Sequence, residues 1–212
     1  REEGPELFGA DPDRIGVEGG SAGGYLTLMT GICLEPRPKA LASMFGYGDI
    51  TGDWYSKPDP FYCKQPMVSK EDAYSAVNKG VISGSHNKTH PFRGRFYLYC
   101  RQNGLWPKEV SGWDPITERE KFKPYSPVEN VTAEYPPTIL SHGDNDTDVP
   151  CELSILMAAE LKRAGVTHEL IILEGKGHGF KGATHEEMVS KVVDKNLAFL
   201  VRHVKNAKDS EK

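Results

Sequence analysis

The stretch Gly-Gly-Ser-Ala-Gly-Gly at residues 19–24 constrains the fold more than any other part of this sequence. It follows residues 13–18, in which apolar Ile15 and Val17 stand two positions apart, a pattern that predicts a short strand. It precedes an apolar run over residues 25–34 that is typical of a buried helix. A Gly-x-Ser-x-Gly motif between a strand and a helix predicts a nucleophile elbow, a sharp turn that exposes its serine.

The geometry of such a turn assigns a role to several of these residues. The turn is tight, so the positions two before and two after the serine, Gly19 and Gly23, should carry almost no side chain. Ser21 then stands off the sheet edge, and the N–H of Ala22 lies at the positive end of the following helix. We expect Ser21 to be a nucleophile and the Ala22 N–H to bind an oxyanion. The alternative is a glycine-rich turn with an idle serine.

Composition argues against several classes of function. The formal net charge of −4 gives no reason to expect binding to nucleic acid or to an anionic membrane. The sequence has no run of about 18 apolar residues, so we expect no membrane span. The four cysteines lie far apart without zinc-ligand spacing, and we expect neither a metal site nor a disulfide scaffold. A single pair between Cys63 and Cys100 stays open as an alternative.

The rest of the chain alternates between strand patterns and helix patterns. We expect strands over residues 40–48, 138–143 and 166–173 and helices over residues 151–165 and 184–203. Such alternation predicts an α/β fold with a parallel sheet that is covered by helices on both faces.

Residues 49–126 interrupt this alternation and are rich in aromatic side chains. An insertion of this length between two sheet strands is typically functional, and we expect a lid whose aromatic residues line a pocket. The alternative is a separate hydrophobic cluster under long loops. Within the insertion, Ser69 and Asp72 predict a capped short helix that runs toward Val77, and residues 91–101 predict a second helix.

Three loops that follow predicted strands carry chemically capable side chains. The first holds Ser21, the second holds three carboxylates, and the third holds His178; the carboxylates are Asp144, Asp146 and Asp148. Ligands of parallel sheets bind outside the carboxyl ends of the strands, so we expect these side chains to meet at one edge.

A serine is a poor nucleophile unless a base takes its proton, and histidine is the side chain whose ordinary pKa suits that task near neutral pH. His178 is the best candidate because Gly177 and Gly179 let the backbone bring its ring into the site. His142 ends a predicted strand, and we expect it to be structural. A carboxylate must hold the base in one tautomer, and the residues alone leave the three aspartates as alternatives for this role.

Four segments resemble one large family. Residues 11–24 are similar to the elbow of alpha/beta-hydrolase esterases, a group that includes acetyl-xylan and feruloyl esterases, hormone-sensitive-lipase-like esterases and relatives of prolyl oligopeptidase. Residues 125–127 and 136–150 resemble the acid loop of these proteins, and residues 175–180 resemble their histidine loop.

The resemblance implies that Asp146, the last residue of the His-Gly-x-x-Asp pattern, is the acid of a Ser21–His178–Asp146 triad. It further implies an enzyme that cleaves small-molecule carboxylic esters through an acyl-enzyme, without a cofactor. We thus expect one partial alpha/beta-hydrolase domain over residues 1–212, with residues 49–126 as a lid-like insertion.

The resemblance fails in one respect. In the family, about four strands and an oxyanion loop with a His-Gly-Gly motif precede the elbow, whereas 20 residues precede Ser21 here. We therefore expect the carboxyl-terminal part of the fold, with an elbow-strand edge that a second copy of the chain or a missing amino-terminal segment covers. Two other functions stay open: an impaired or non-catalytic hydrolase-like module, and a peptidase of the prolyl-oligopeptidase type, for which the sequence holds no propeller repeat.

Overall fold

The computed structural model describes residues 3–75, 77 and 93–209. The chain divides into two compact units, and we describe each by itself. Unit 1 consists of residues 1–49 and 123–212, and unit 2 consists of residues 50–122.

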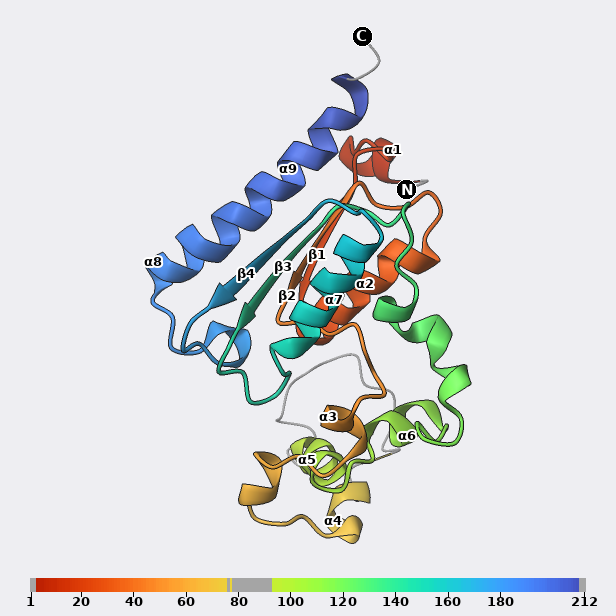
Figure 1. Ribbon diagram of the computed structural model, residues 1–212, viewed down its shortest axis with the longest axis vertical. Helices are drawn as coiled ribbons and strands as arrows, with labels where there is room; N and C mark the ends of the chain where they lie inside the picture. The colour runs from red at the N-terminus through yellow and green to blue at the C-terminus, as the bar shows by residue number, and fades with distance from the viewer. Residues whose placement is uncertain (1–2, 76, 78–92, 210–212) are drawn as a thin grey trace. The chain divides into compact units, whose positions relative to one another are not determined.

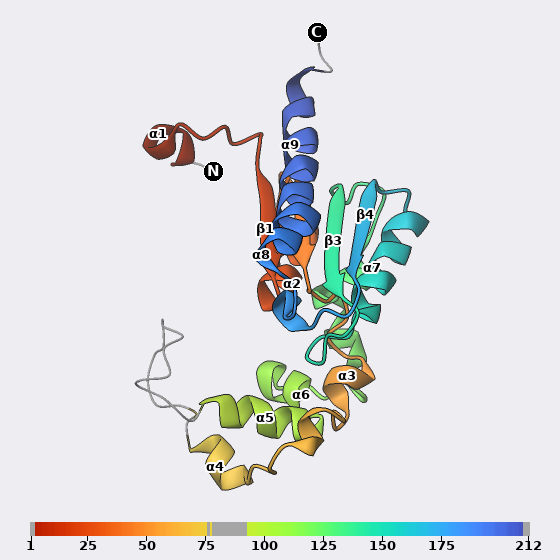
Figure 2. The ribbon, with the colours of Figure 1, turned by 90° about the vertical axis from the view of Figure 1, so that its left-hand side faces the viewer.

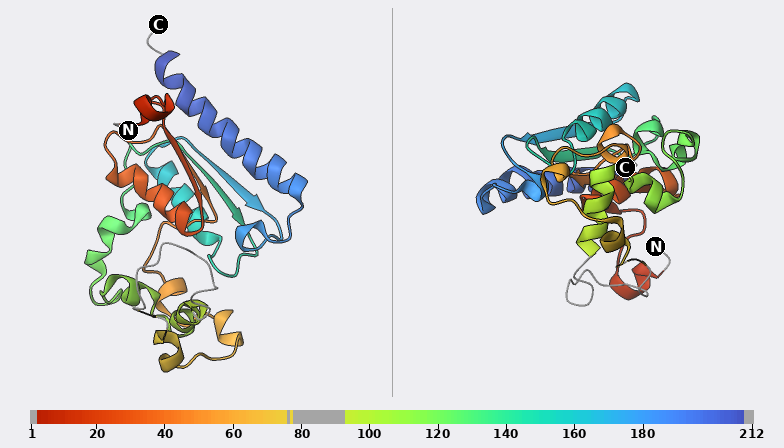
Figure 3. Two further views of the ribbon diagram at one scale, coloured as in Figure 1. Left: turned by 180° about the vertical axis from the view of Figure 1, so that it is seen from behind. Right: turned by 90° about the horizontal axis from the view of Figure 1, so that it is seen from below.

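Unit 1 is built on a parallel sheet of four strands in the order β1-β2-β3-β4. The strands are β1 (Gly16–Gly20), β2 (Ala40–Met44), β3 (Thr138–Gly143) and β4 (His168–Leu173). All four run toward the same end of the sheet (Figures 1 and 3), so the loops after them share one edge. The predicted parallel sheet is confirmed.

Helices cover both faces of this sheet. The helices α2 (Ala22–Cys33) and α7 (Glu152–Arg163) lie on one face, and α9 (Asp194–Asp209) lies on the other, as Figure 2 shows. The alternation of side chains along each strand divides them between the two faces. In β2, for example, Leu41 packs with α2 and α7, whereas Ala40 and Ala42 pack against Phe199 of α9.

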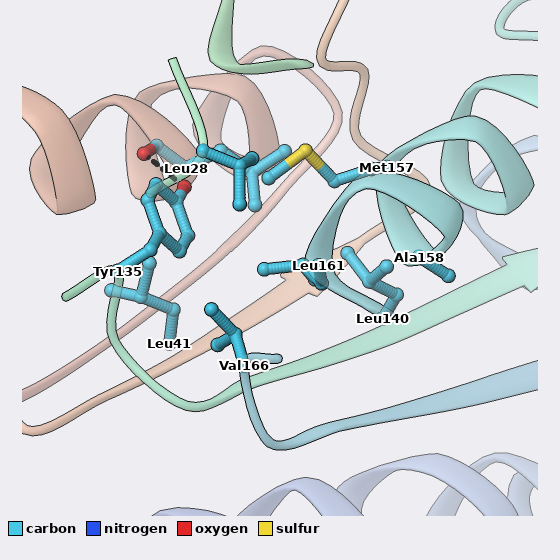
Figure 4. Close-up of a cluster of buried hydrophobic side chains, with 9 residues drawn as sticks. Leu28, Leu41, Tyr135, Leu140, Met157, Ala158, Leu161 and Val166 are labelled. Atoms are coloured by element: carbon cyan, nitrogen blue, oxygen red, sulfur yellow. Dashed lines mark hydrogen bonds between the residues drawn. The ribbon is translucent and has the colours of Figure 1, made fainter. Parts of the chain in front are cut away.

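The larger core lies between the sheet, α2 and α7 (Figure 4). Its buried members are Leu28, Leu41, Val131, Tyr135, Leu140, Met157, Ala158, Leu161 and Val166. The buried Tyr135 hydroxyl donates a hydrogen bond to the Leu28 carbonyl, which satisfies a polar group inside this apolar cluster. This packing fixes the position of α2, the helix that follows the elbow.

The carboxyl-terminal helix is less regular than the sequence pattern predicted. Instead of one helix over residues 184–203, the structure has α8 (His185–Met188), a π-helical turn (Val189–Val193) and then α9. Thr184 and Glu187 form a reciprocal capping box at the start of α8. Unit 1 also contains α1 (Gly4–Phe8), two 3₁₀ turns (Lys123–Tyr125 and Pro127–Glu129) and a third at His178–Phe180.

Strand β1 forms an edge of the described sheet, since its one partner there is β2. A groove of about 570 Å³ beside it is lined by apolar Ile15, Val17 and Leu34. The expectation that a second copy of the chain or a missing amino-terminal segment covers this edge stays a prediction. Sedimentation velocity at micromolar concentration should show self-association, and a monodisperse monomer with undiminished solubility would contradict it.

Unit 2 is a small helical unit. Its helices are α3 (Asp53–Ser56), α4 (Lys70–Tyr74), α5 (Arg93–Asn103) and α6 (Trp106–Ser111), with 3₁₀ turns at Tyr62–Lys64 and Arg119–Lys121. Ser69 caps α4 by accepting a hydrogen bond from the Asp72 N–H, as predicted. Residues 91 and 92 of the second predicted helix lie outside the described residues. Cys63 and Cys100 are free thiols, so the alternative of a disulfide between them is wrong.

A buried cation organises unit 2. The Arg101 side chain is fully buried, and its Nη2 lies 2.7 Å from Asp59 Oδ2. Its guanidinium lies between 4.6 and 5.6 Å from four aromatic rings, those of Trp54, Tyr55, Tyr62 and Tyr97. Several aromatic residues of the insertion also pack on one another, as in the pairs Trp54–Tyr55 and Tyr62–Tyr97. The role of the insertion as a lid stays a prediction.

The Arg101 pair supports a stability prediction. Asp59→Asn removes the carboxylate 2.7 Å from the buried guanidinium, and we expect the free energy of unfolding of unit 2 to fall by about 3–5 kcal/mol. All three tryptophans lie within residues 50–122, so their fluorescence during chemical unfolding reports on this unit. The control is Asp53→Asn, which removes an exposed pair with Lys57. Equal losses in the two variants would contradict the prediction.

Candidate active site

The serine of the elbow has the backbone conformation that the motif predicts. Ser21 lies between β1 and α2 with φ 55° and ψ −123°, a strained conformation for a residue with a side chain. Its N–H donates to the Met44 carbonyl at 2.9 Å, which ties the turn to the end of β2. Strain of this kind persists where the surroundings enforce it, and here two packed strands and α2 do so.

The two glycines that flank the serine differ in their surroundings. A Cβ added at Gly19 would lie 2.4 Å from the Gly23 carbonyl oxygen, so a side chain cannot be accommodated there. A Cβ added at Gly23 would meet no heavy atom within 4 Å outside its own helix and chain neighbours. The prediction that crowding requires glycine is therefore supported at Gly19 and wrong at Gly23, where an added Cβ would meet open space.

The structure brings Ser21, His178 and Asp146 together from the loops after β1, β4 and β3. His178 Nε2 lies 3.0 Å from Ser21 Oγ, and His178 Nδ1 lies 2.8 Å from Asp146 Oδ2. The carboxylate accepts the proton on Nδ1, which leaves Nε2 free to accept the serine O–H. The ring of Phe45 packs edge-on against the His178 imidazole, with the ring centres 5.0 Å apart.

Four donors hold the Asp146 carboxylate. Oδ1 accepts hydrogen bonds from the N–H groups of Asp148 and Val149, and Oδ2 lies within 3.2 Å of nitrogens of both His178 and His142. Burial alone would raise the pKa of Asp146, but the hydrogen bonds from His142, His178 and the two N–H groups outweigh burial and hold this pKa well below its usual range. Asp146 is therefore ionised throughout the pH range in which a histidine titrates.

The two other aspartates of this loop have different positions. Asp144 Oδ1 accepts a hydrogen bond from the Gly175 N–H at 2.6 Å, which joins the loops after β3 and β4. Asp148 Oδ2 lies 3.6 Å from His178 Nε2, on the side of the ring that faces the serine. Of the three alternatives, Asp146 is thus the one whose carboxylate contacts Nδ1 of the base.

Sequence reasoning missed two neighbours of this cluster. Phe45 follows β2 and contacts the His178 ring, and nothing in its local sequence indicates that contact. His142, which we expected to be structural, is fully buried at the end of β3 and contacts Asp146. The one available signal was spacing, because His142, near the end of β3, precedes Asp146 by four residues.

Ala22 is the first residue of α2, a helix of 12 residues. The first N–H groups of a helix have no partner within it, and they lie at the positive end of its dipole. An anion bound beside Ser21 would meet this N–H. Within the described ranges, no group of three or more His, Cys, Asp or Glu side chains is arranged to hold a metal ion, and no helix is long and apolar enough to cross a membrane.

One known protein family has a sequence model that matches this chain. The model of the prolyl oligopeptidase family matches residues 97–207, more than half of the sequence. The chain belongs to the prolyl oligopeptidase family. The matched segment includes Asp146 and His178 and begins after Ser21.

This member of the prolyl oligopeptidase family is also similar to named esterases. It is 26% identical to esterase LipQ of Mycobacterium tuberculosis over 91% of this chain and 39% of that protein. It is 27% identical to a probable isoprenylcysteine alpha-carbonyl methylesterase of Arabidopsis thaliana over 81% of this chain and 31% of that protein. The chain thus spans less than two fifths of the length of these curated relatives.

A solved structure agrees with the fold. The chain matches a structure described as a truncated form of a carbohydrate esterase from gut microbiota with a TM-score of 0.60 and 19% identity, over 96% of this chain and 64% of that one. At this identity the similarity concerns the alpha/beta-hydrolase fold alone.

Proposed function

We propose that this chain is a serine hydrolase that cleaves carboxylic esters through an acyl-enzyme. The observation that carries the proposal is the His178 imidazole, which bridges the Ser21 hydroxyl and the Asp146 carboxylate through its two nitrogens. A buried, ionised carboxylate beside Nδ1 orients the ring and stabilises its cation, and that arrangement turns an ordinary serine into a nucleophile.

The proposed reaction has two halves. Ser21 Oγ attacks the ester carbonyl carbon while His178 Nε2 takes the serine proton, and the carbonyl oxygen becomes an anion that the Ala22 N–H binds. The C–O bond to the alcohol then breaks, and the alcohol leaves with the proton from His178. In the second half, water attacks the acyl-serine with His178 again as base, which releases the carboxylic acid and restores Ser21.

An ester is our first choice of substrate because two relatives that align over most of the chain are named as esterases. The family description favours a peptidase as the second candidate. The third candidate is an impaired or non-catalytic module. We assign one oxyanion donor, and each donor typically contributes a factor of about 100–1000 to the rate, so a site with one donor would be slow.

One experiment separates the three candidates. The folded chain and a heat-denatured sample are treated with a fluorophosphonate probe, and the folded chain is then assayed with p-nitrophenyl acetate and with a peptidyl p-nitroanilide. An esterase is labelled only when folded and has the higher kcat/KM for the ester. A higher kcat/KM for the peptide indicates a peptidase, and absence of labelling in a well-folded sample indicates the non-catalytic module.

A further inference from the structure

We propose that His142 is a positioning residue for the triad, which donates a hydrogen bond to the same Asp146 oxygen that His178 uses. The inference rests on the proposed function, because it concerns how the acid holds the base. It assigns a task to a histidine that the reaction itself does not use.

The partners of His142 fix where its ring proton lies. Nε2 lies 3.0 Å from the Val149 carbonyl oxygen and 3.2 Å from Asp146 Oδ2, and both of these oxygens can only accept. Nε2 must therefore carry a proton. Nδ1 lies 2.7 Å from Ser154 Oγ on α7, and in the neutral ring it accepts the proton of that hydroxyl. Ser154 thus orients the ring so that its N–H donates to the Val149 carbonyl, and Asp146 Oδ2 lies 3.2 Å from the same nitrogen.

The contact is built into the core of unit 1. His142 and the Asp146 side chain have no exposed surface, and Ser154 is 2% exposed. Oδ1 of Asp146 is already occupied by two N–H groups, so the carboxylate cannot rotate to exchange its oxygens. Oδ2 thus lies near one imidazole nitrogen of each histidine, 2.8 Å from His178 Nδ1 and 3.2 Å from His142 Nε2.

Sharing Oδ2 limits how strongly Asp146 attracts a proton to His178. A carboxylate whose charge is partly neutralised by a second donor stabilises the imidazolium less, so removal of that donor should raise the pKa of the base. Other titratable groups face this cluster: Asp148 beside His178 Nε2, Asp144 in the same loop, and the Cys151 thiol before α7. None of them changes in the variants described next.

Two substitutions of His142 test the proposal. Both introduce the same amide group, but on side chains of different length. In His142→Gln the side-chain N–H can stand where the ring Nε2 stood and can still donate to Asp146. In His142→Asn the amide reaches only the position of Nδ1, beside Ser154, and cannot reach Asp146. The readout is the titration midpoint of His178 in the full chain, followed through its ring ¹⁵N shifts without substrate. We expect His142→Asn to raise this midpoint by about one pH unit and His142→Gln to leave it near the wild-type value.

Ser141→Ala is the matched control, because it removes a buried hydrogen bond of the same strand, to Asn196. It should lower the free energy of unfolding without moving the His178 midpoint. If His142→Asn and His142→Gln shift the midpoint equally, or no more than Ser141→Ala does, the proposal is wrong.

A wild-type measurement can still overturn the proposal if the asparagine variant fails to fold. The ring ¹⁵N shifts of His142 at neutral pH should place a proton on Nε2, and a ring protonated on Nδ1 alone would overturn the proposal. Fluorophosphonate labelling of the wild-type chain is measured in parallel. Absence of labelling rejects the proposed function, whereas labelling combined with an unchanged His178 midpoint in His142→Asn rejects this inference alone.

Discussion

Ser21→Ala is expected to reduce the rate of p-nitrophenyl acetate hydrolysis by up to about a million-fold. The substitution removes the oxygen that forms the acyl-enzyme and leaves His178 Nε2 without the proton that it takes. Initial rates over a range of ester concentrations measure the effect, and the same variant should not react with a fluorophosphonate.

Ser43→Ala provides the matched control for this loss. Ser43 lies on the neighbouring strand β2, and its buried Oγ has no hydrogen-bond partner among the described residues. Its removal should therefore leave the hydrolysis rate close to that of the wild type. Retention of more than about a tenth of the rate in Ser21→Ala is incompatible with a loss of this size and would reject Ser21 as the nucleophile.

The second large effect concerns the acid. Asp146→Asn should lower kcat by about ten-thousand-fold, because an amide N–H beside His178 Nδ1 favours the tautomer whose proton is on Nε2. That tautomer cannot accept the serine proton. Asp144→Asn is the control, since an asparagine oxygen can still accept from the Gly175 N–H, and its kcat should stay near the wild-type value. A larger loss in Asp148→Asn than in Asp146→Asn would contradict the assignment.

The same carboxylate gives a pH dependence of stability. The pKa of Asp146 is lowered in the folded state, so its ionised form stabilises the fold above the pKa of an unfolded aspartate, about 4. This contribution is lost as the pH falls through the folded-state value. The difference in unfolding free energy between the wild type and Asp146→Asn should therefore be largest near neutral pH and shrink below about pH 4, as measured by chemical unfolding.

Local pattern accounts for much of the fold. The parallel sheet of unit 1 follows from alternating elements, and the loops with Ser21, Asp146 and His178 meet because each follows a strand of that sheet. The prediction of one continuous carboxyl-terminal helix was less accurate. A π-helical turn leaves the apolar periodicity of the sequence largely intact, so the pattern does not reveal it.

Contacts between segments that are distant in the sequence could not be predicted, for a physical reason. Arg101 and Asp59 meet across 42 positions, and Ser154 meets His142 only because α7 packs on the sheet in one particular register. Local pattern gives the type of an element, whereas such pairs depend on how elements are rotated against each other. For the same reason, the residues alone left three aspartates as alternatives, and the side-chain contacts of Asp146 distinguish it from the other two.

Trapping the acyl-enzyme is the most direct test of whether Ser21 is the nucleophile. The chain is mixed with p-nitrophenyl acetate, quenched in acid within the first turnovers and digested, and the peptides are analysed by mass spectrometry. We expect one acetyl group on the peptide that contains Ser21, and no such adduct in Ser21→Ala. Ester turnover by the folded chain with that peptide unmodified, or with acetyl groups scattered over lysines alone, would contradict it.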